Sequence, residues 1–425
     1  GSDEVPEAPE PGINRYDRSS LSSPLRWPRD WNRSFELTVD DPRGGVLLLH
    51  GMSDSPYSLR QLGERLHQDG FHVVGLRYPG HGTAPGSLTR TTWEDMAGAV
   101  ALAARYLAAE LDGKPLYLFG YSTGAPLAVN YTLDALAGLE NARPAGLVFF
   151  SPAMGVTPLA ALTPWQARLG RLLGFKKMAW NSIEIEYDPF KYRSFPLNAA
   201  VQVWRLSGHV NARLAAAAAS DSLSDMPPVL SFQSVVDSTI EASAVVSVLY
   251  DRVGPARGER AHELVAFDLN RSAQIEPILA ADPRERLAAL LADASRGYEF
   301  TVISNESSRT PEVMSRTGPF GELPERRCDL PEFWPPGVYS MTHVAPPFPP
   351  DDPLYGGERA KPYDGISLGN VVLRGEGGAL AVSAAGFLRQ SYNPFFGYQL
   401  QRINRFLGLV PEPVCLPRPG PESSG

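Results

Sequence analysis

Short runs of apolar residues alternate along this 425-residue chain with longer stretches in which apolar residues recur every three or four positions. Each run is typical of a strand buried on both faces, and the runs lie at residues 45–52, 71–76, 116–119, 146–151 and 228–237. The longer stretches predict helices at residues 58–70, 93–111 and 125–136. This alternation predicts an α/β fold: a doubly wound, mostly parallel sheet with helices on both faces.

The two ends of the chain and its last third have weaker patterns. Residues 1–33 have little pattern and are interpreted as an extension or linker, and alternating apolar side chains predict an antiparallel strand at residues 34–40. After residue 237 the pattern predicts helices at 241–253, 283–294 and 397–406, and strands at 263–267 and 298–303. Residues 154–226 are not needed to build the sheet, so we expect an inserted segment there within a core made of residues 34–153 and 227–425.

The sequence Gly120-Tyr121-Ser122-Thr123-Gly124 lies between a predicted strand and a predicted helix. A serine at such a sharp turn needs small neighbours two positions to either side, because the strained backbone brings the flanking chain close. A G-x-S-x-G sequence alone is a weak signal in a chain with 39 glycines. The strand before it and the helix after it make Ser122 a candidate nucleophile.

The predicted strand that begins at residue 45 stops at His50-Gly51-Met52. Acyl transfer needs two backbone N–H donors for the developing oxyanion, one from the residue after the nucleophile and one from the loop after an earlier strand. The expected oxyanion hole is therefore formed by the N–H groups of Thr123 and Met52. The alternative is that this His-Gly sequence is only a strand end followed by a turn.

A third motif is the glycine-rich turn R-Y-P-G-H-G at residues 77–82. Together with H-G-x-x-x-S-P at residues 50–56 and with the G-x-S-x-G sequence, it resembles the motifs of the α/β-hydrolase superfamily. The three motifs are most similar to those of its monoglyceride lipase and carboxylesterase branch. The resemblance covers about residues 43–240. It departs at Ala125, where a glycine is common, and in a much longer stretch before the catalytic histidine.

In this fold the nucleophile is followed along the chain by an acid and then by a histidine. Of the seven histidines, four precede Ser122 and His209 lies in the inserted segment. His262 would begin a strand, at the end of the sheet away from the expected site. His343 is therefore the expected base; His262 and the absence of any triad are the alternatives.

The predicted strand at residues 228–237 ends in Asp237, at a position that resembles the acid of the family. Ser234 stands where the family usually has a glycine. Asp268 also follows a predicted strand and is the second candidate. For both residues, the alternative is an aspartate in a surface turn.

The resemblance implies a serine hydrolase that cleaves carboxylic esters through an acyl-enzyme on Ser122. Lipophilic acyl or aryl esters, with monoacylglycerol-like compounds among them, are the implied substrates. It also implies that the inserted segment is a helical cap, or lid, over the nucleophile, although most of its many apolar side chains must pack among themselves and on the core. The alternatives are an amidase, a thioesterase or an acyltransferase of the same fold, and a non-catalytic hydrolase-like binding protein.

Composition narrows the expected partners. The net charge is −8 and the pI about 5.5, without a basic stripe, which argues against nucleic acid and against an anionic membrane surface. No segment is apolar enough over a sufficient length to span a bilayer. Asp351 and Asp352 lie between prolines, which is more typical of a rigid turn than of a metal site. A small-molecule ester, and no cofactor or metal, is therefore expected.

The two cysteines, Cys328 and Cys415, are compatible with one disulfide or with two separate thiols. Gly1-Ser2 is typical of a cloning remnant, and residues 3–12 are an acidic, proline-rich linker. This pattern fits an exported protein from which a signal or anchor segment was removed, with a cytoplasmic protein as the alternative.

Overall fold

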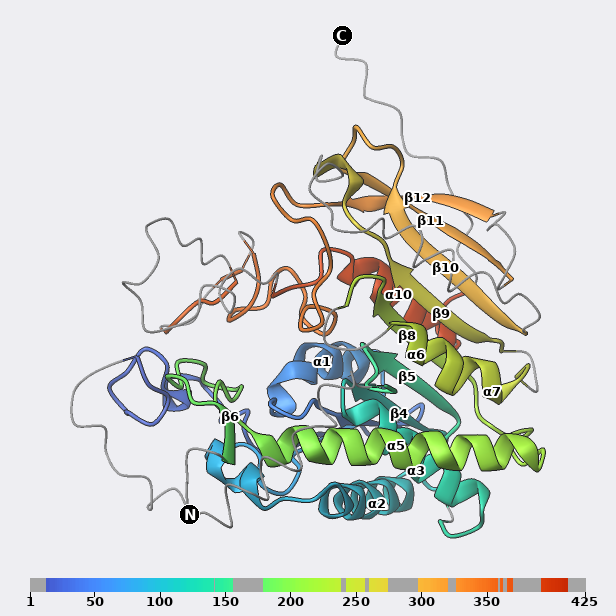
Figure 1. Cartoon of the computed structure of the whole chain (residues 1–425), viewed down its shortest axis with the longest axis horizontal. Coiled ribbons are helices and arrows are strands. Elements are labelled where there is room, and N and C mark those ends of the chain that lie inside the picture. Colours follow the sequence, from blue (N-terminus) through green and yellow to red (C-terminus); the bar gives the residue numbers. More distant parts are fainter. Residues whose placement is uncertain are drawn as a thin grey trace.

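The computed structural model contains a ten-stranded sheet with the strand order β1-β3-β2-β4-β5-β8-β9-β10-β11-β12 (Figure 1). The structure describes residues 13–140, 142–155, 179–237, 242–256, 260–273, 297–319, 326–357, 360–361, 365–369 and 391–411. The predicted linker at 3–12, the predicted helix at 283–294, Cys415 and residues 156–178 of the inserted segment lie outside these ranges.

Seven neighbouring strands of the sheet, from β3 to β10 in spatial order, run parallel to one another. The bounds are β1 Phe35–Leu37, β2 Gly45–Leu49, β3 His72–Leu76, β4 Leu116–Tyr121, β5 Gly146–Phe150, β8 Val229–Ser234, β9 His262–Phe267, β10 Tyr298–Asn305, β11 Glu312–Pro319 and β12 Arg326–Phe333. Strand β1 pairs antiparallel with β3, and β11 and β12 continue the sheet antiparallel to β10. The predicted strands are confirmed, whereas β11 and β12 were not predicted.

The remaining elements surround the sheet. The α-helices are α1 Arg60–Gln68, α2 Trp93–Glu110, α3 Gly124–Leu136, α5 Leu197–Ala219, α6 Ala242–Ala244, α7 Asp251–Val253 and α10 Phe396–Phe406. The 3-10 helices are η2 Pro24–Arg26, η3 Pro56–Leu59, η4 Pro85–Thr89 and η7 Arg271–Ala273, and η6 Val245–Tyr250 is a π-helix between α6 and α7. The short strands β6 Trp180–Ser182 and β7 Phe195–Pro196 pair in a separate sheet.

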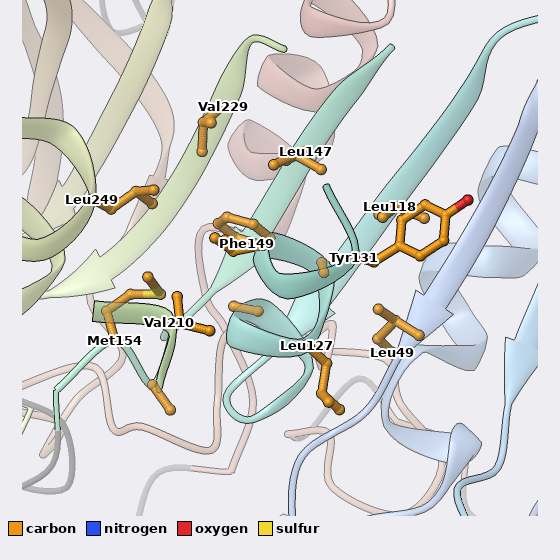
Figure 2. Close-up of a cluster of buried hydrophobic side chains, with 14 of the residues drawn as sticks. Leu49, Leu118, Leu127, Tyr131, Leu147, Phe149, Met154, Val210, Val229 and Leu249 are labelled. Carbon is orange, nitrogen blue, oxygen red and sulfur yellow. The ribbon is translucent and has the colours of Figure 1, made fainter. Parts of the chain in front are cut away.

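Consecutive residues of the parallel strands enter two different cores, which explains why these strands appear as continuous apolar runs. In β4, Leu118 belongs to the core under α2, α3 and α5, whereas Tyr117 and Phe119 belong to the core under α1 and α10. Figure 2 shows the first of these cores, in which Phe149 of β5 lies near Leu127 of α3 and Val210 of α5. The predicted two-sided covering of the sheet is confirmed.

Local sequence sets where individual helices begin and end. Helix α2 begins after Thr92, whose side chain accepts a hydrogen bond from the Asp95 N–H while the Asp95 carboxylate accepts one from the Thr92 N–H. This reciprocal pair satisfies two donors that a helix N-terminus would otherwise leave unpaired. Helix α1 is followed by Gly70 at φ 91°, a backbone conformation that favours glycine.

The described part of the N-terminal segment is packed against the body of the molecule. Trp27 is buried, and its ring makes edge contacts with those of Tyr57 and Phe190 at centroid distances of 5.4 and 5.0 Å. The division of the chain into extension, core and inserted cap stays a prediction.

Among the helices of the described ranges, none combines the length and apolar character needed to cross a bilayer. The parallel strands β4, β5 and β8 all end at the same edge of the sheet. This edge is where open α/β sheets bind their ligands, because the loops after neighbouring parallel strands meet there.

Candidate active site

Ser122 lies at the turn between β4 and α3, with a backbone φ of 52°. Such a left-handed conformation is strained for a serine and is held here by neighbouring chain. The Ser122 N–H donates to the Phe150 carbonyl at 2.9 Å, and the Ser122 carbonyl accepts from the N–H groups of Ala125 and Ala153 at 3.1 Å each. Ala125, the departure from the family pattern, is fully buried in this turn.

The glycines on either side of Ser122 are required by close packing of backbone. A Cβ on Gly120 would stand 2.6 Å from the Ala125 nitrogen, and a Cβ on Gly124 would stand 2.1 Å from the Leu49 carbonyl oxygen. Both distances are shorter than real Cβ atoms adopt, so any larger residue would displace the turn. The G-x-S-x-G pattern therefore has a steric cause in this structure.

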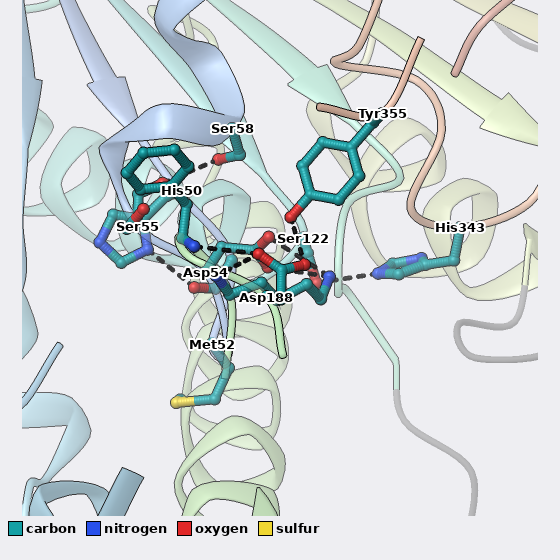
Figure 3. Close-up of polar contacts among 12 residues, drawn as sticks. His50, Met52, Asp54, Ser55, Ser58, Ser122, Asp188, His343 and Tyr355 are labelled. Carbon is teal, nitrogen blue, oxygen red and sulfur yellow. Dashed lines mark hydrogen bonds and ion pairs between the residues drawn. The ribbon is translucent and has the colours of Figure 1, made fainter. Parts of the chain in front are cut away.

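The structure brings together the three side chains that the sequence singled out. His343 Nε2 lies 3.1 Å from Ser122 Oγ (Figure 3). His343 Nδ1 lies 2.8 Å from Asp237 Oδ2. The Asp237 side chain is fully buried and that of His343 is 9 % exposed. A hydroxyl, an imidazole and a carboxylate in this order can pass a proton from the hydroxyl to the ring, with the carboxylate holding the ring in the required tautomer.

Asp237 follows β8 by three residues and is held by its own strand. The Gln233 side-chain amide donates to Asp237 Oδ2 at 3.2 Å, and the Asp237 N–H donates to the Ser234 carbonyl at 3.3 Å. Sequence reasoning did not single out Gln233. The signal that could have found it is a buried amide in a strand whose neighbours are mostly apolar.

His343 lies on a loop that returns to the sheet after β10, β11 and β12. The loop is tied to the end of β9 by Asn270, whose N–H donates to the Tyr339 carbonyl at 2.8 Å and whose side-chain amide donates to the Val338 carbonyl at 2.7 Å. Sequence reasoning also missed Asn270. Its bond to Val338 joins residues 68 positions apart, so no local pattern points to it.

The alternative candidates are engaged elsewhere. His262 begins β9 at the opposite end of the sheet, where its Nδ1 accepts a hydrogen bond from the Val229 N–H at 3.1 Å. Burial lowers the pKa of His262 to about 4. Asp268 forms an ion pair with Arg271 at 2.8 Å.

The loop after β2 presents its carbonyl groups to donors on three sides. The Gly51 carbonyl accepts from His50 Nδ1 at 2.8 Å, and the Met52 carbonyl accepts from His81 Nε2 at 2.8 Å. The Ser53 carbonyl accepts from the Tyr192 N–H at 2.7 Å.

The carbonyls of this loop have hydrogen-bond partners, whereas the two N–H groups expected to bind the oxyanion have none among the described residues. Within the described ranges, neither the Met52 N–H nor the Thr123 N–H has a hydrogen-bond partner in the protein, although both residues are buried. Because buried N–H groups are normally paired, two such donors next to a strained serine suit an incoming oxyanion.

Asp351 and Asp352 are engaged in structural contacts. Asp352 is fully buried, and its Oδ1 accepts from the Tyr57 hydroxyl at 2.9 Å and from two backbone N–H groups of the following turn. Burial raises the pKa of Asp352, and Arg60 lies 3.6 Å away. The part of the chain that the structure describes contains no cluster of three metal-ligating side chains.

Cys328 on β12 is disulfide-bonded. This outcome agrees with the one-disulfide interpretation of the two cysteines and excludes a free thiol at this position.

The strand order, the strained serine and the three converging side chains define an α/β-hydrolase fold. Residues 40–232, a little under half of the chain, match the family model Hydrolase_4, described as serine aminopeptidase, S33. The chain thus resembles the α/β-hydrolase superfamily and, within it, the branch of monoglyceride lipases and esterases.

Individual relatives are distant. The thermostable monoacylglycerol lipase of Bacillus sp. (strain H-257) is 26 % identical over 170 residues, which cover 40 % of this chain; the chain spans 64 % of that relative's length. A soluble variant of the monoglyceride lipase of Saccharomyces cerevisiae is 16 % identical with a TM-score of 0.42, over 55 % of this chain and 82 % of that one. A monoacylglycerol lipase of Paleococcus ferrophilus is 20 % identical with a TM-score of 0.40, over 55 % and 88 %.

Proposed function

We propose that this chain is a serine hydrolase that cleaves carboxylic esters through an acyl-enzyme on Ser122. The observation that carries the proposal is the 3.1 Å contact between His343 Nε2 and Ser122 Oγ, continued to the buried carboxylate of Asp237. The family match supports a serine hydrolase, and the monoacylglycerol lipase relative supports ester cleavage.

In the first half of the reaction, His343 Nε2 takes the proton of the Ser122 hydroxyl as its oxygen attacks the ester carbonyl. Asp237 accepts from the Nδ1–H of the ring, and this hydrogen bond stabilises the imidazolium that forms. The N–H groups of Met52 and Thr123 receive the oxyanion, and each donor contributes about 3 kcal/mol to transition-state stabilisation. The imidazolium then protonates the leaving alcohol.

In the second half, water replaces the alcohol. His343 takes a proton from this water, which attacks the acyl carbon, and the same two N–H groups stabilise the second oxyanion. Release of the carboxylic acid returns the proton to Ser122. Every step uses side chains and backbone groups of the chain itself.

We infer that the substrates are lipophilic acyl or aryl esters, with monoacylglycerol-like compounds among them, and that the segment between β5 and β8 acts as the cap. The support for a cap is that Tyr192, within this segment, hydrogen-bonds to the loop after β2. An amidase or thioesterase would use the same residues, so substrate comparison decides between these chemistries.

The Ser122→Ala variant tests the proposal with a panel of p-nitrophenyl esters of increasing chain length. We expect kcat to fall at least about a thousandfold because the nucleophile is removed. The Tm should change little, because the substitution removes one oxygen and fills no space. Ser87→Ala, on the exposed surface of η4, is the matched control and should retain full activity.

Activity of Ser122→Ala above a thousandth of the parent would contradict the proposed nucleophile. Aryl amides and thioesters of the same acyl group are measured in parallel with the parent protein. Higher kcat/KM on the amide or thioester than on the matched ester would assign the chain to that chemistry instead.

A further inference from the structure

We propose that Lys191 is a positioning residue for the proposed esterase reaction: it neutralises Asp54 beside the oxyanion donors and holds the loop after β2 in place. This inference rests on the proposed function and adds a role for the segment between β6 and β7. Neither residue is part of the hydroxyl–imidazole–carboxylate chain.

Asp54 lies near the proposed nucleophile, on the other side of Gly51. The position that a Cβ would take on Gly51 is 2.8 Å from Asp54 Oδ2 and 3.4 Å from Ser122 Cβ. Asp54 is also two residues after Met52, the proposed oxyanion donor, and its side chain is only 6 % exposed. An unpaired carboxylate with so little exposure to solvent would repel a negative charge that forms on a substrate at Ser122.

Lys191 supplies the compensating charge. Its Nζ lies 3.3 Å from Asp54 Oδ1 and 3.4 Å from Oδ2, and its side chain is 15 % exposed. These two residues are 137 positions apart, so the ion pair forms only when the segment carrying Lys191 is folded onto the loop after β2. The low exposure of both side chains means that water screens the pair weakly.

The turn that carries Lys191 is rigidly built. Asp188 Oδ1 accepts from the N–H groups of Phe190 and Lys191 at 2.9 and 3.0 Å, and its Oδ2 accepts from the Tyr355 hydroxyl at 2.5 Å (Figure 3). The Phe190 ring stacks on that of Tyr57 at 4.3 Å. The lysine is thus presented from a turn anchored on both sides, which reduces the entropy lost in forming the ion pair.

The next residue ties the same turn to the oxyanion loop. The Tyr192 N–H donates to the Ser53 carbonyl at 2.7 Å, and the Tyr192 hydroxyl accepts from the Thr83 N–H at 2.8 Å. The Tyr192 ring also lies against His81, which donates to the Met52 carbonyl. Lys191 and Tyr192 therefore hold the loop at residues 54 and 53, and His81 holds it at residue 52.

Loss of the neutralising charge should change kcat and KM in a way that a simple loss of packing would not. Lys191→Met keeps the aliphatic stem but leaves the Asp54 carboxylate without its cation. We expect kcat on a neutral aryl ester to fall at least tenfold with KM changed less than threefold, because the unpaired charge acts on the transition state. Lys191→Arg should retain most of the activity.

The decisive variant is the double substitution Asp54→Asn/Lys191→Met. It removes the uncompensated charge together with the cation, so its kcat should be at least fivefold above that of Lys191→Met alone. The matched control is Lys114→Met, which removes an exposed ion pair with Asp41 and should leave kcat unchanged. Should Lys191→Met not fold, the double variant compared with Asp54→Asn alone still tests the coupling.

The outcomes separate this inference from the proposed function. A parent protein that hydrolyses no ester or thioester would overturn both. An active parent with unchanged kcat in Lys191→Met, or a double variant no better than Lys191→Met, would overturn only the role of Lys191. A rise in KM confined to substrates with polar groups would also overturn it, since Lys191 would then bind substrate directly.

Discussion

At the scale of single residues, close backbone packing determines where Ser122, the proposed nucleophile, lies. Ser122 has a left-handed backbone because α3 starts almost immediately after β4 ends, and Gly124 lies against the Leu49 carbonyl of β2. The strain is local, and the surrounding hydrogen bonds hold it in place. The hydroxyl is thereby presented at the N-terminus of α3, where partial positive charge favours an anion.

Gly124→Ala should destabilise the protein by at least about 3 kcal/mol, because its Cβ would overlap the Leu49 oxygen. Gly98→Ala on the exposed face of α2 is the control; no atom lies within 4 Å of its Cβ position. That substitution should raise the free energy of unfolding by up to about 1 kcal/mol. Urea titrations of both variants measure these changes, and equal stabilities would contradict the steric argument.

A second residue-scale prediction concerns acid sensitivity. His262 is fully buried, and its Nδ1 accepts from the Val229 N–H, so the folded state holds it neutral and its pKa is lowered to about 4. Between pH 6.5 and 4 the unfolded chain binds a proton that the folded chain does not, so stability falls as the pH decreases. From pH 7 to 5 the loss due to His262 should be about 2 kcal/mol.

The comparison variant is His262→Gln, which keeps an acceptor for Val229 but does not titrate. Its free energy of unfolding should depend less on pH than that of the parent by this amount. His67→Gln, on the half-exposed surface of α1, is the control and should follow the parent. Parallel curves for His262→Gln and the parent would refute the assignment.

At the scale of elements, the strands that were predicted and those that were missed differ in what they bury. The strands β2, β4 and β5 have apolar side chains on both faces, so their composition alone is enough to predict a strand. In β11 the inward face carries Ser315 and Thr317, both buried. Polar inward residues conceal the period-two alternation on which strand prediction depends.

Strand β12 escaped prediction for a related reason. Leu330 is its only buried residue, and the backbone of the strand pairs with β11. A sequence pattern based on burial carries almost no information about such a strand.

Asn270, near the end of β9, bonds to the loop that carries His343, the proposed base. Asn270→Ala removes the side-chain bond to the Val338 carbonyl while keeping the backbone bond to Tyr339. We expect kcat to fall about tenfold with KM nearly constant, because His343 would sample more orientations. Steady-state kinetics on an aryl ester provides the test; unchanged kcat with reduced Tm would mean that Asn270 has a purely structural role.

At the scale of the whole molecule, the site is assembled from distant parts of the chain. After Asp268 the chain extends the sheet with β10, β11 and β12, and it then returns with His343 beside Ser122. Helix α10 is tied to two neighbouring strands of this sheet, because Arg402 bonds to Glu263 of β9 and Glu299 of β10 at 2.5 and 2.8 Å. These buried charges are paired, as low-dielectric surroundings require.

This assembly explains which site residues the sequence could predict. Ser122 has a local motif, Asp237 ends a recognisable strand, and His343 was selected by elimination from seven histidines. Gln233 bonds to Asp237 only four residues away, but no motif marks it. Asn270 and Lys191 act through tertiary contacts that leave no periodic or motif signal. Chain patterns report local geometry, whereas these contacts depend on how separate segments pack.

The most direct test of the account is reaction of the whole protein with a fluorophosphonate, followed by intact-mass measurement and peptide mapping. We predict one adduct per chain, located on Ser122, because this hydroxyl alone has the His343 base and the oxyanion donors beside it. Labelling of His343→Ala should be slower by at least a hundredfold. An adduct on another residue, or labelling of His343→Ala at the rate of the parent, would contradict the account.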